Sequence, residues 1–177
     1  MLPSSGDKIQ PAFQYARQRG LSLGPRLGYG KDGTVFSTLP QDVSPGNWAG
    51  PTAIKAMARD DLYARELAVY RRLAERGIGG PIRVCGHNVP QLLGQDDELL
   101  VIEMTIVTRP FVLDFASAYL DEPPEFPAEV MEERYTHWSD VFEGQWPAVQ
   151  RIMAEFRRYG IYLLDPSPGN IAFEGDA

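Results

Sequence analysis

The stretch LGYGKDGTVF, residues 27–36, constrains the fold most, because three glycines stand at regular spacing between two apolar segments. Glycine, aspartate and lysine are turn formers, so the stretch predicts a strand, a tight turn and a second strand. Since glycine has no Cβ, Gly28, Gly30 and Gly33 would also let the backbone approach a ligand closely. An ordinary hairpin explains this stretch when it is taken alone, so the rest of the chain has to decide.

Length and composition limit the class of protein. The chain has 177 residues, of which 44% are hydrophobic, which is enough for one domain with a core or for two small lobes that share a cleft. The net charge of −7 argues against a nucleic-acid partner. A single cysteine, Cys85, excludes an intramolecular disulfide and fits a reducing compartment. No apolar stretch approaches the roughly 20 residues that a membrane-spanning helix needs. We therefore expect a cytoplasmic protein of bacterial style, without a membrane partner.

Hydrophobic periodicity and turn residues divide the chain into elements. Strands are expected within residues 21–36 on both sides of the turn that contains Gly28, Gly30 and Gly33, which we call the glycine turn. Further strands are expected at 52–57, 91–93 and 99–104. Helices are expected at 7–19, 60–76, 112–120, 129–142 and 145–159, with Asp60 or Asp61 capping the second. Residues 39–51 read as a surface loop. Trp138 and Trp146 are expected in the core. The pattern predicts an α+β protein in which a small antiparallel sheet with one helix precedes a mainly helical part.

A lysine at the end of an apolar strand is a second candidate position. Lys55 ends the run Ala53-Ile54-Lys55, and a lysine buried there needs a partner for its charge. Glu66, early in the next predicted helix, is the natural partner. A solvated pair worth under about 1 kcal/mol explains the two residues equally well if they stand alone.

A third candidate lies near the end of the sequence. Asp165 follows an apolar run that starts at Ile161, and it opens the turn Asp-Pro-Ser-Pro-Gly-Asn, which ends at Asn170. An aspartate at the mouth of such a turn can accept a proton from a hydroxyl, and an asparagine oxygen can ligate magnesium. Both residue types are also common turn formers beside proline and glycine.

These three segments, in this order, make the chain resemble the protein-kinase-like superfamily over roughly residues 21–174. That superfamily includes small bacterial kinases and aminoglycoside or choline phosphotransferases. The resemblance implies a two-lobed fold, with an N-terminal lobe at about 1–104, a hinge at 105–110 and a reduced helical C-terminal lobe at 111–177. It also implies that the chain binds ATP and Mg²⁺.

The resemblance assigns a role to individual residues. Lys55 and Glu66 would position the phosphates, Asp165 would be the catalytic base, and Asn170 would bind the metal. The nucleotide-binding residues that it implies are Gly28, Tyr29, Gly30, Lys31, Asp32, Gly33, Val35, Ala53, Lys55, Ile102, Glu103 and Thr105. Ile102 would be the gatekeeper, and the backbone of Glu103 and Thr105 would contact adenine. The Pro-Gly before Asn170 is closer to the phosphotransferase and atypical-kinase form than to the standard protein-kinase loop.

Two departures from the family pattern bear on activity. The His and Arg that usually precede the catalytic aspartate are Leu163 and Leu164. No Asp-Phe-Gly metal aspartate follows Asn170, and Asp176 is too close to replace it. Asp114, just after the predicted hinge, is expected to cap a turn or face solvent, with contact to a ribose hydroxyl as the alternative. We therefore expect Asn170 to hold the metal almost alone and phosphotransfer to be slow.

Three functions remain open from the sequence. The first is an ATP-dependent phosphotransferase that acts on a protein or another acceptor. The second is a pseudokinase, a module that binds a partner protein without catalysis. The third is a fragment of a small-molecule kinase. An acidic chain suits a cationic or neutral acceptor better than an anionic one. A last strand at residues 171–174, if unpaired, would be a free edge that favours dimerisation.

Overall fold

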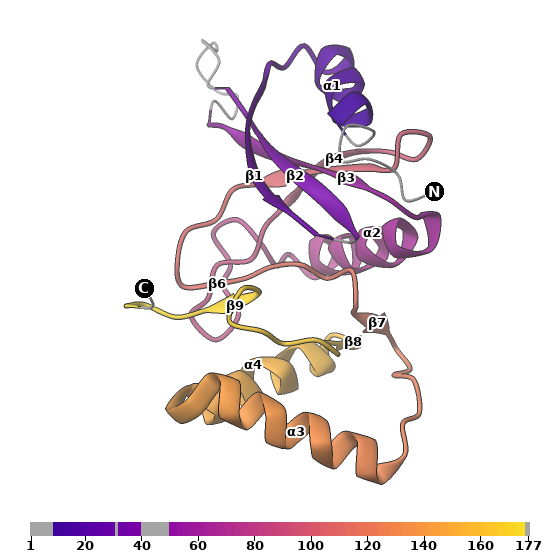
Figure 1. Cartoon of the computed structure of the whole chain (residues 1–177). Coiled ribbons are helices and arrows are strands. Elements are labelled where there is room, and N and C mark those ends of the chain that lie inside the picture. The colour runs from indigo at the N-terminus through magenta and orange to yellow at the C-terminus, as the bar shows by residue number, and fades with distance from the viewer. Residues whose placement is uncertain (1–8, 31, 40–49, 176–177) are drawn as a thin grey trace.

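The structure is a computed structural model that describes residues 9–30, 32–39 and 50–175, and it combines a sheet with helices in an α+β arrangement (Figure 1). Lys31, Asp176 and most of the expected loop at 39–51 lie outside the described residues. No helix within the described ranges is long and apolar enough to cross a membrane.

The centre of the fold is a five-stranded antiparallel sheet with the order β1-β2-β3-β5-β4. Its strands are β1 (Leu23–Tyr29), β2 (Gly33–Thr38), β3 (Thr52–Met57), β4 (Leu92–Asp96) and β5 (Val101–Thr105). The expected strand at 52–57 is confirmed with both of its ends, and the last two strands are shifted by up to three residues. The glycine turn joins β1 to β2 and therefore lies at the end of this outer pair of strands.

One helix covers each face of the sheet (Figure 1). Side chains alternate along β3, so Ile54 and Ala56 pack towards helix α1 (Ile9–Gln18) on one face. Ala53 faces the opposite side and packs in the cluster of helix α2 (Asp60–Glu75). Both helices were expected. The expected cap of α2 was wrong: the first flanking residue is Arg59, and Asp61 accepts hydrogen bonds from the Arg59 guanidinium at 3.0 and 2.6 Å instead of capping the helix.

Two further helices make up most of the helical region, by which we mean residues 111–175. Helix α3 (Ala128–Phe142) and helix α4 (Trp146–Arg158) are joined by a short 3-10 turn, η1 (Glu143–Gln145). Trp138 and Trp146 are buried with their ring centroids 6.0 Å apart, which confirms them as core residues. The same buried cluster continues through Phe156 to the face of α2, so one core joins the helices to the sheet.

The expected helix at 112–120 was wrong. That segment contains two short strands, β6 (Phe111–Val112) and β7 (Tyr119–Leu120), which pair antiparallel with β9 (Ile171–Ala172) and β8 (Ile161–Tyr162). Apolar residues at 112, 115, 116 and 118 fit a helical period, but the partners of the two strands lie far along the chain, where a local pattern cannot register them.

The last strand is not unpaired. Ile171 and Ala172 are buried, and they pair with Val112 and Phe111 of β6. The premise of a free strand at 171–174 was therefore wrong, because the strand is only two residues long and β6 already occupies one of its edges.

A buried carboxylate ties α1 to the sheet, and it gives a stability test. The Tyr15 hydroxyl donates to Glu103 Oε2 at 2.9 Å, and both residues are buried. Tyr15→Phe leaves that oxygen with one donor fewer, so we expect the free energy of unfolding in urea to fall by about 1–2 kcal/mol. Tyr135→Phe is the matched control, because Tyr135 lies at the surface of α3, and it should leave the unfolding midpoint unchanged. Equal effects of both substitutions would contradict this account.

Candidate functional site

A cavity of about 510 Å³ lies between the sheet and the β6–β9 pair. The glycine turn, β3, α2 and the segment after β5 form most of its wall, and residues just after β6 and just before β9 complete it. Most of the residues singled out in the sequence meet here. Those that line the cavity are Gly28, Tyr29, Gly30, Asp32, Gly33, Val35, Ala53, Lys55, Glu66, Thr105 and Asn170. Ile102, Glu103 and Asp165 do not line it, and Lys31 is outside the described residues.

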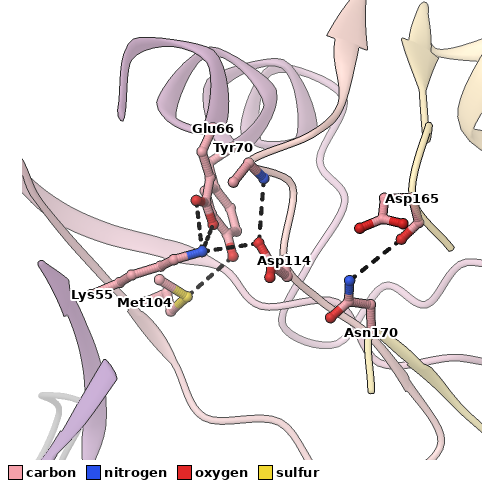
Figure 2. Close-up of polar contacts among 8 residues, drawn as sticks. Lys55, Glu66, Tyr70, Met104, Asp114, Asp165 and Asn170 are labelled. Atoms are coloured by element: carbon pink, nitrogen blue, oxygen red, sulfur yellow. Dashed lines mark hydrogen bonds and ion pairs between the residues drawn. The ribbon is translucent and has the colours of Figure 1, made fainter. Parts of the chain in front are cut away.

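The Lys55 ammonium is the polar centre of this cavity (Figure 2). Its Nζ atom donates to both carboxylate oxygens of Glu66, at 2.9 and 2.8 Å, and to Asp114 Oδ1 at 3.0 Å. Lys55 is 7% exposed and Glu66 is fully buried, so the expected pair is a buried ion pair rather than a solvated one. An ammonium has three N–H donors, and here all three point to carboxylates.

The charges of the pair depend on one another. Burial alone would lower the pKa of Lys55, but the carboxylates of Glu66 and Asp114 act against it, and the pKa is raised above its ordinary value. Complete burial raises the pKa of the Glu66 carboxyl, and the Lys55 ammonium opposes that rise. Because its pKa is raised, Lys55 stays charged at neutral pH.

Asp114 caps a turn and reaches solvent as expected, but it also has a partner that the sequence did not predict, Lys55. Asp114 follows β6, and the β6–β9 pairing continues beside it, where the Leu113 N–H donates to the Asn170 carbonyl at 2.9 Å. The backbone of Asp114 is left-handed, with φ of 65°, and Figure 2 shows its side chain between Lys55 and Asn170. It also accepts a weak hydrogen bond from the Ala116 N–H at 3.4 Å, so the expected turn cap is present, but its main partner is Lys55.

The next residue, Phe115, anchors Asp114 to the core. Its side chain is completely buried, and its ring meets Tyr70 of α2 edge-on, with centroids 5.3 Å apart, and Phe156 of α4 at 5.7 Å. Through these contacts with α2 and α4, Phe115 holds the neighbouring Asp114 backbone in place. The sequence contains a signal for this carboxylate, because Asp114-Phe115 follows the apolar run Phe111-Val112-Leu113. It precedes the Asp165 turn, however, whereas the metal aspartate of the family that the sequence resembles follows that turn.

The glycine turn forms the roof of the cavity, and its three glycines differ in what the fold demands. At Gly33 an added Cβ would lie 2.8 Å from the Ala56 carbonyl oxygen, so close strand packing requires glycine there. Among the described residues, an added Cβ at Gly28 or Gly30 would meet nothing within 4 Å, and neither glycine has a positive φ. The described part of the fold therefore does not require glycine at 28 and 30, whereas space for a ligand under the turn does.

The inner wall of the cavity lies two residues further along than the sequence indicated. Met104 lines the cavity and Ile102 packs beneath it in the core, because alternate residues of β5 share a face. The Tyr70 hydroxyl donates to Met104 Sδ at 3.1 Å, and both residues close this wall. Burial, with the nearby carboxylates of Glu66 and Asp114, raises the pKa of Tyr70, so its hydroxyl keeps its proton.

The two residues expected to contact adenine, Glu103 and Thr105, differ in position: Thr105 lines the cavity and Glu103 does not. Glu103 is paired on both sides, with Ile54 of β3 and Gly94 of β4, and its side chain points to α1. The Thr105 N–H donates to the Gln91 carbonyl at 3.0 Å. Ile106 and Val107 follow β5 outside its ladder and line the cavity, so backbone groups for a ligand lie there.

Asp165 lies at the edge of the site, on the far side of Asn170 from Lys55 (Figure 2). Its exposed side chain borders a second, very small cavity of about 10 Å³, whose wall also includes Asp114, Ser117 and Asn170. The Asn170 side-chain amide donates to the Asp165 carbonyl oxygen at 3.5 Å. The two aspartates thus flank Asn170 on opposite sides.

Asp114 and Asn170 are the residues that can hold a cation. Within the described part of the chain, no group of three or more His, Cys, Asp or Glu side chains has the arrangement of a metal site. A carboxylate and an amide oxygen at the mouth of a cavity suit Mg²⁺ that also binds the phosphates of a ligand, since this ion uses one or two protein oxygens together with phosphates and water.

Comparison with known proteins identifies no family: no protein-family model matches the chain, and a search of curated proteins finds no match either.

The buried ion pair gives a second stability test. Glu66→Ala leaves the Lys55 ammonium buried with one partly exposed partner, so we expect the free energy of unfolding in urea at pH 7 to fall by about 3–5 kcal/mol. The matched control is Asp61→Ala, which breaks the exposed ion pair with Arg59 and should leave the midpoint nearly unchanged. A small loss for Glu66→Ala would mean that Lys55 is not held as described.

Proposed function

We propose that the protein binds a nucleoside triphosphate with Mg²⁺ in the cavity and transfers its terminal phosphoryl group. The observation that carries the proposal is the Lys55 ammonium, held by Glu66 and Asp114 beneath a glycine turn whose Gly28 and Gly30 the fold does not require. A buried cation, close backbone approach and oxygen ligands for magnesium are the devices that phosphoryl transfer needs. The proposal includes the kinase-like two-lobed arrangement, with the hinge at the segment after β5.

Lys55 would exchange one partner when the nucleotide binds. Glu66 is fully buried and keeps two of the three donors, whereas the Asp114 side chain is 41% exposed and holds the third. A phosphate oxygen can replace Asp114 at little desolvation cost, because Asp114 already reaches solvent. Lys55 would then contact the phosphates while Glu66 fixes its direction, and Asp114 would be released to bind the metal.

Asp114 and Asn170 would hold the metal. Asp114 would supply the metal carboxylate beside Asn170, and Asp114-Phe115 is followed by alanine where the family motif has glycine. Bound magnesium would neutralise charge on the phosphates. Because β6 and β9 pair, the two residues are positioned by one backbone ladder although 56 positions separate them in sequence.

The base of the nucleotide would lie against the segment after β5. Val35 and Ala53 line the cavity above it, and Met104 with Tyr70 closes its inner end. Thr105, Ile106 and Val107 line the cavity at that place, so their backbone groups would be the hydrogen-bonding groups for the base, whereas Glu103, which was also expected to contact it, does not line the cavity.

Asp165 would accept the proton of the acceptor hydroxyl beside the nucleotide cavity, next to Asn170. Its exposed carboxylate leaves that side open to a second substrate. Residues 105–177 contain 13 Asp and Glu against 5 Lys and Arg, so this half carries the negative charge of the chain. The field there favours a cationic or neutral acceptor over an anionic one.

One observation favours the second function, a binding module without catalysis. The three donors of Lys55 are satisfied by the protein alone, so the site is stable without a ligand. In that case Asp114 would be a permanent structural partner of Lys55, and neither nucleotide nor magnesium would displace it.

Thermal unfolding distinguishes the two functions. A ligand that binds only the folded state raises its stability by mass action. We expect millimolar ATP with Mg²⁺ to raise the Tm of the wild-type protein by several degrees and to have no effect on Lys55→Ala. We expect Asp114→Asn to respond to ATP equally with and without Mg²⁺, because it lacks the metal carboxylate. Asp61→Asn, altered far from the cavity, should respond as the wild type does. No rise in the wild type would reject nucleotide binding and favour the binding module.

Phosphoryl transfer itself is tested with labelled ATP and either the protein alone or a panel of amine-bearing and neutral hydroxyl acceptors. We expect Asp165→Asn to abolish most of the transferred label while keeping the ATP-dependent rise in Tm, since Asp165 does not line the nucleotide cavity. Asp140→Asn, on the exposed part of α3, is the control and should transfer normally. Transfer that persists in Asp165→Asn would remove Asp165 from the mechanism.

A further inference from the structure

Arg134 connects the middle of α3 to the turn that carries Asp165. Its guanidinium donates to the Leu164 carbonyl oxygen, one residue before Asp165. The two residues are 30 positions apart in sequence, and Arg134 is partly buried. No other hydrogen bond between the described side chains of α3 and the turn is present in the structure.

Aromatic rings hold the guanidinium in place. Arg134 Cζ lies 4.9 Å from the ring centroid of Phe126 and 5.2 Å from that of Trp138, one helical turn further along α3. Trp138 is buried against Trp146 of α4, so it cannot move independently of the core. A planar cation between two rings has little freedom, and its N–H groups keep a fixed direction.

Apart from the Leu113 N–H, which donates to the Asn170 carbonyl and joins the end of the turn to β6, the turn that receives this hydrogen bond is closed by local contacts. The N–H groups of Asn170 and Ile171 donate to the Ser167 carbonyl at 2.9 and 2.8 Å. The Asn170 amide adds a long contact to the Asp165 carbonyl. These bonds fix the shape of the turn, but they do not fix its place relative to α3, which the bond from Arg134 does.

We propose that Arg134 is a positioning residue for Asp165: by holding the main chain at Leu164 against α3, it sets where the Asp165 carboxylate stands relative to Asp114 and Asn170. The inference rests on the proposed function, in which Asp165 takes the proton of the acceptor. The two residues before Asp165 are leucines and donate no side-chain hydrogen bond, so a donor from another element is needed to hold this backbone.

The substitutions are chosen to separate position from charge. Arg134→Gln removes the cation and its stacking, whereas Arg134→Lys keeps a cation but lacks the planar fork. The matched control is Arg157→Gln, because Arg157 also donates to a backbone carbonyl, that of Met153, but does so within α4.

Hydrogen exchange tests the positioning without any need for activity. We expect Arg134→Gln to speed exchange of the Asn170 and Ile171 amides at least tenfold, measured by NMR or on peptides spanning 161–172, while peptides of α2 are unchanged. Arg134→Lys should fall between Arg134→Gln and the wild type, and Arg157→Gln should match the wild type. Unchanged exchange in Arg134→Gln would overturn the inference whether or not the protein transfers phosphate.

Kinetics give the second readout. We expect Arg134→Gln to lower kcat about 10- to 100-fold with little change in the KM for ATP, because Lys55 and the glycine turn are not altered, with Arg134→Lys intermediate. A loss confined to the KM for ATP would also overturn the inference. Faster exchange in Arg134→Gln with no transfer by the wild-type protein would uphold the role of Arg134 in placing the turn and would reject phosphoryl transfer instead.

Discussion

The central constraint of this molecule is the cost of burying the Lys55 ammonium. A cation in a low-dielectric interior is strongly destabilising unless carboxylates surround it. Glu66 of α2 and Asp114 of the segment after β6 supply these carboxylates. The Lys55 ammonium thus connects three parts of the chain: β3, α2 and the segment after β6. The orientation of α2 on the sheet and the close approach of the helical region both follow from this contact. The cavity lies next to this contact, with Lys55 in its wall.

The parts of the site that the sequence predicted are those defined by local pattern. The glycine spacing, the strand ending at Lys55 and the helix carrying Glu66 are each readable within about 15 residues, and the structure places these residues around the cavity. The segment at 112–120 was misread as a helix because its structure depends on pairing with residues 161–172. The contact of Asp114 with Lys55 was missed for the same reason, since it depends on what lies beside β6 and not on the neighbours of Asp114 in sequence.

The remaining errors come from side-chain direction. A motif comparison placed the gatekeeper at Ile102, but strand alternation and the ladder with β3 and β4 put Met104 at the wall and send Glu103 to α1. Aligning a sequence motif positions a strand residue only to within one or two residues. A shift of two residues keeps the side chain on the same face of the strand but changes which residue lines the cavity. Tyr70 has no sequence signature: one turn after Glu66, it reads as a core residue of α2.

The pairing of β6 with β9 has a consequence for how such a protein can change. Because Val112 and Ile171 are register partners, the chain leaves the cavity after Asp114 and returns to it at Gly169, at neighbouring points. Everything between, including α3 and α4, therefore has the geometry of an inserted module with neighbouring ends, the arrangement in which insertions and exchanges are best tolerated. Under the proposed function, the surface that would meet an acceptor could be lengthened, shortened or replaced while Asp114 and Asn170 stay side by side. Acceptor specificity and cation binding would thereby be separable along the chain.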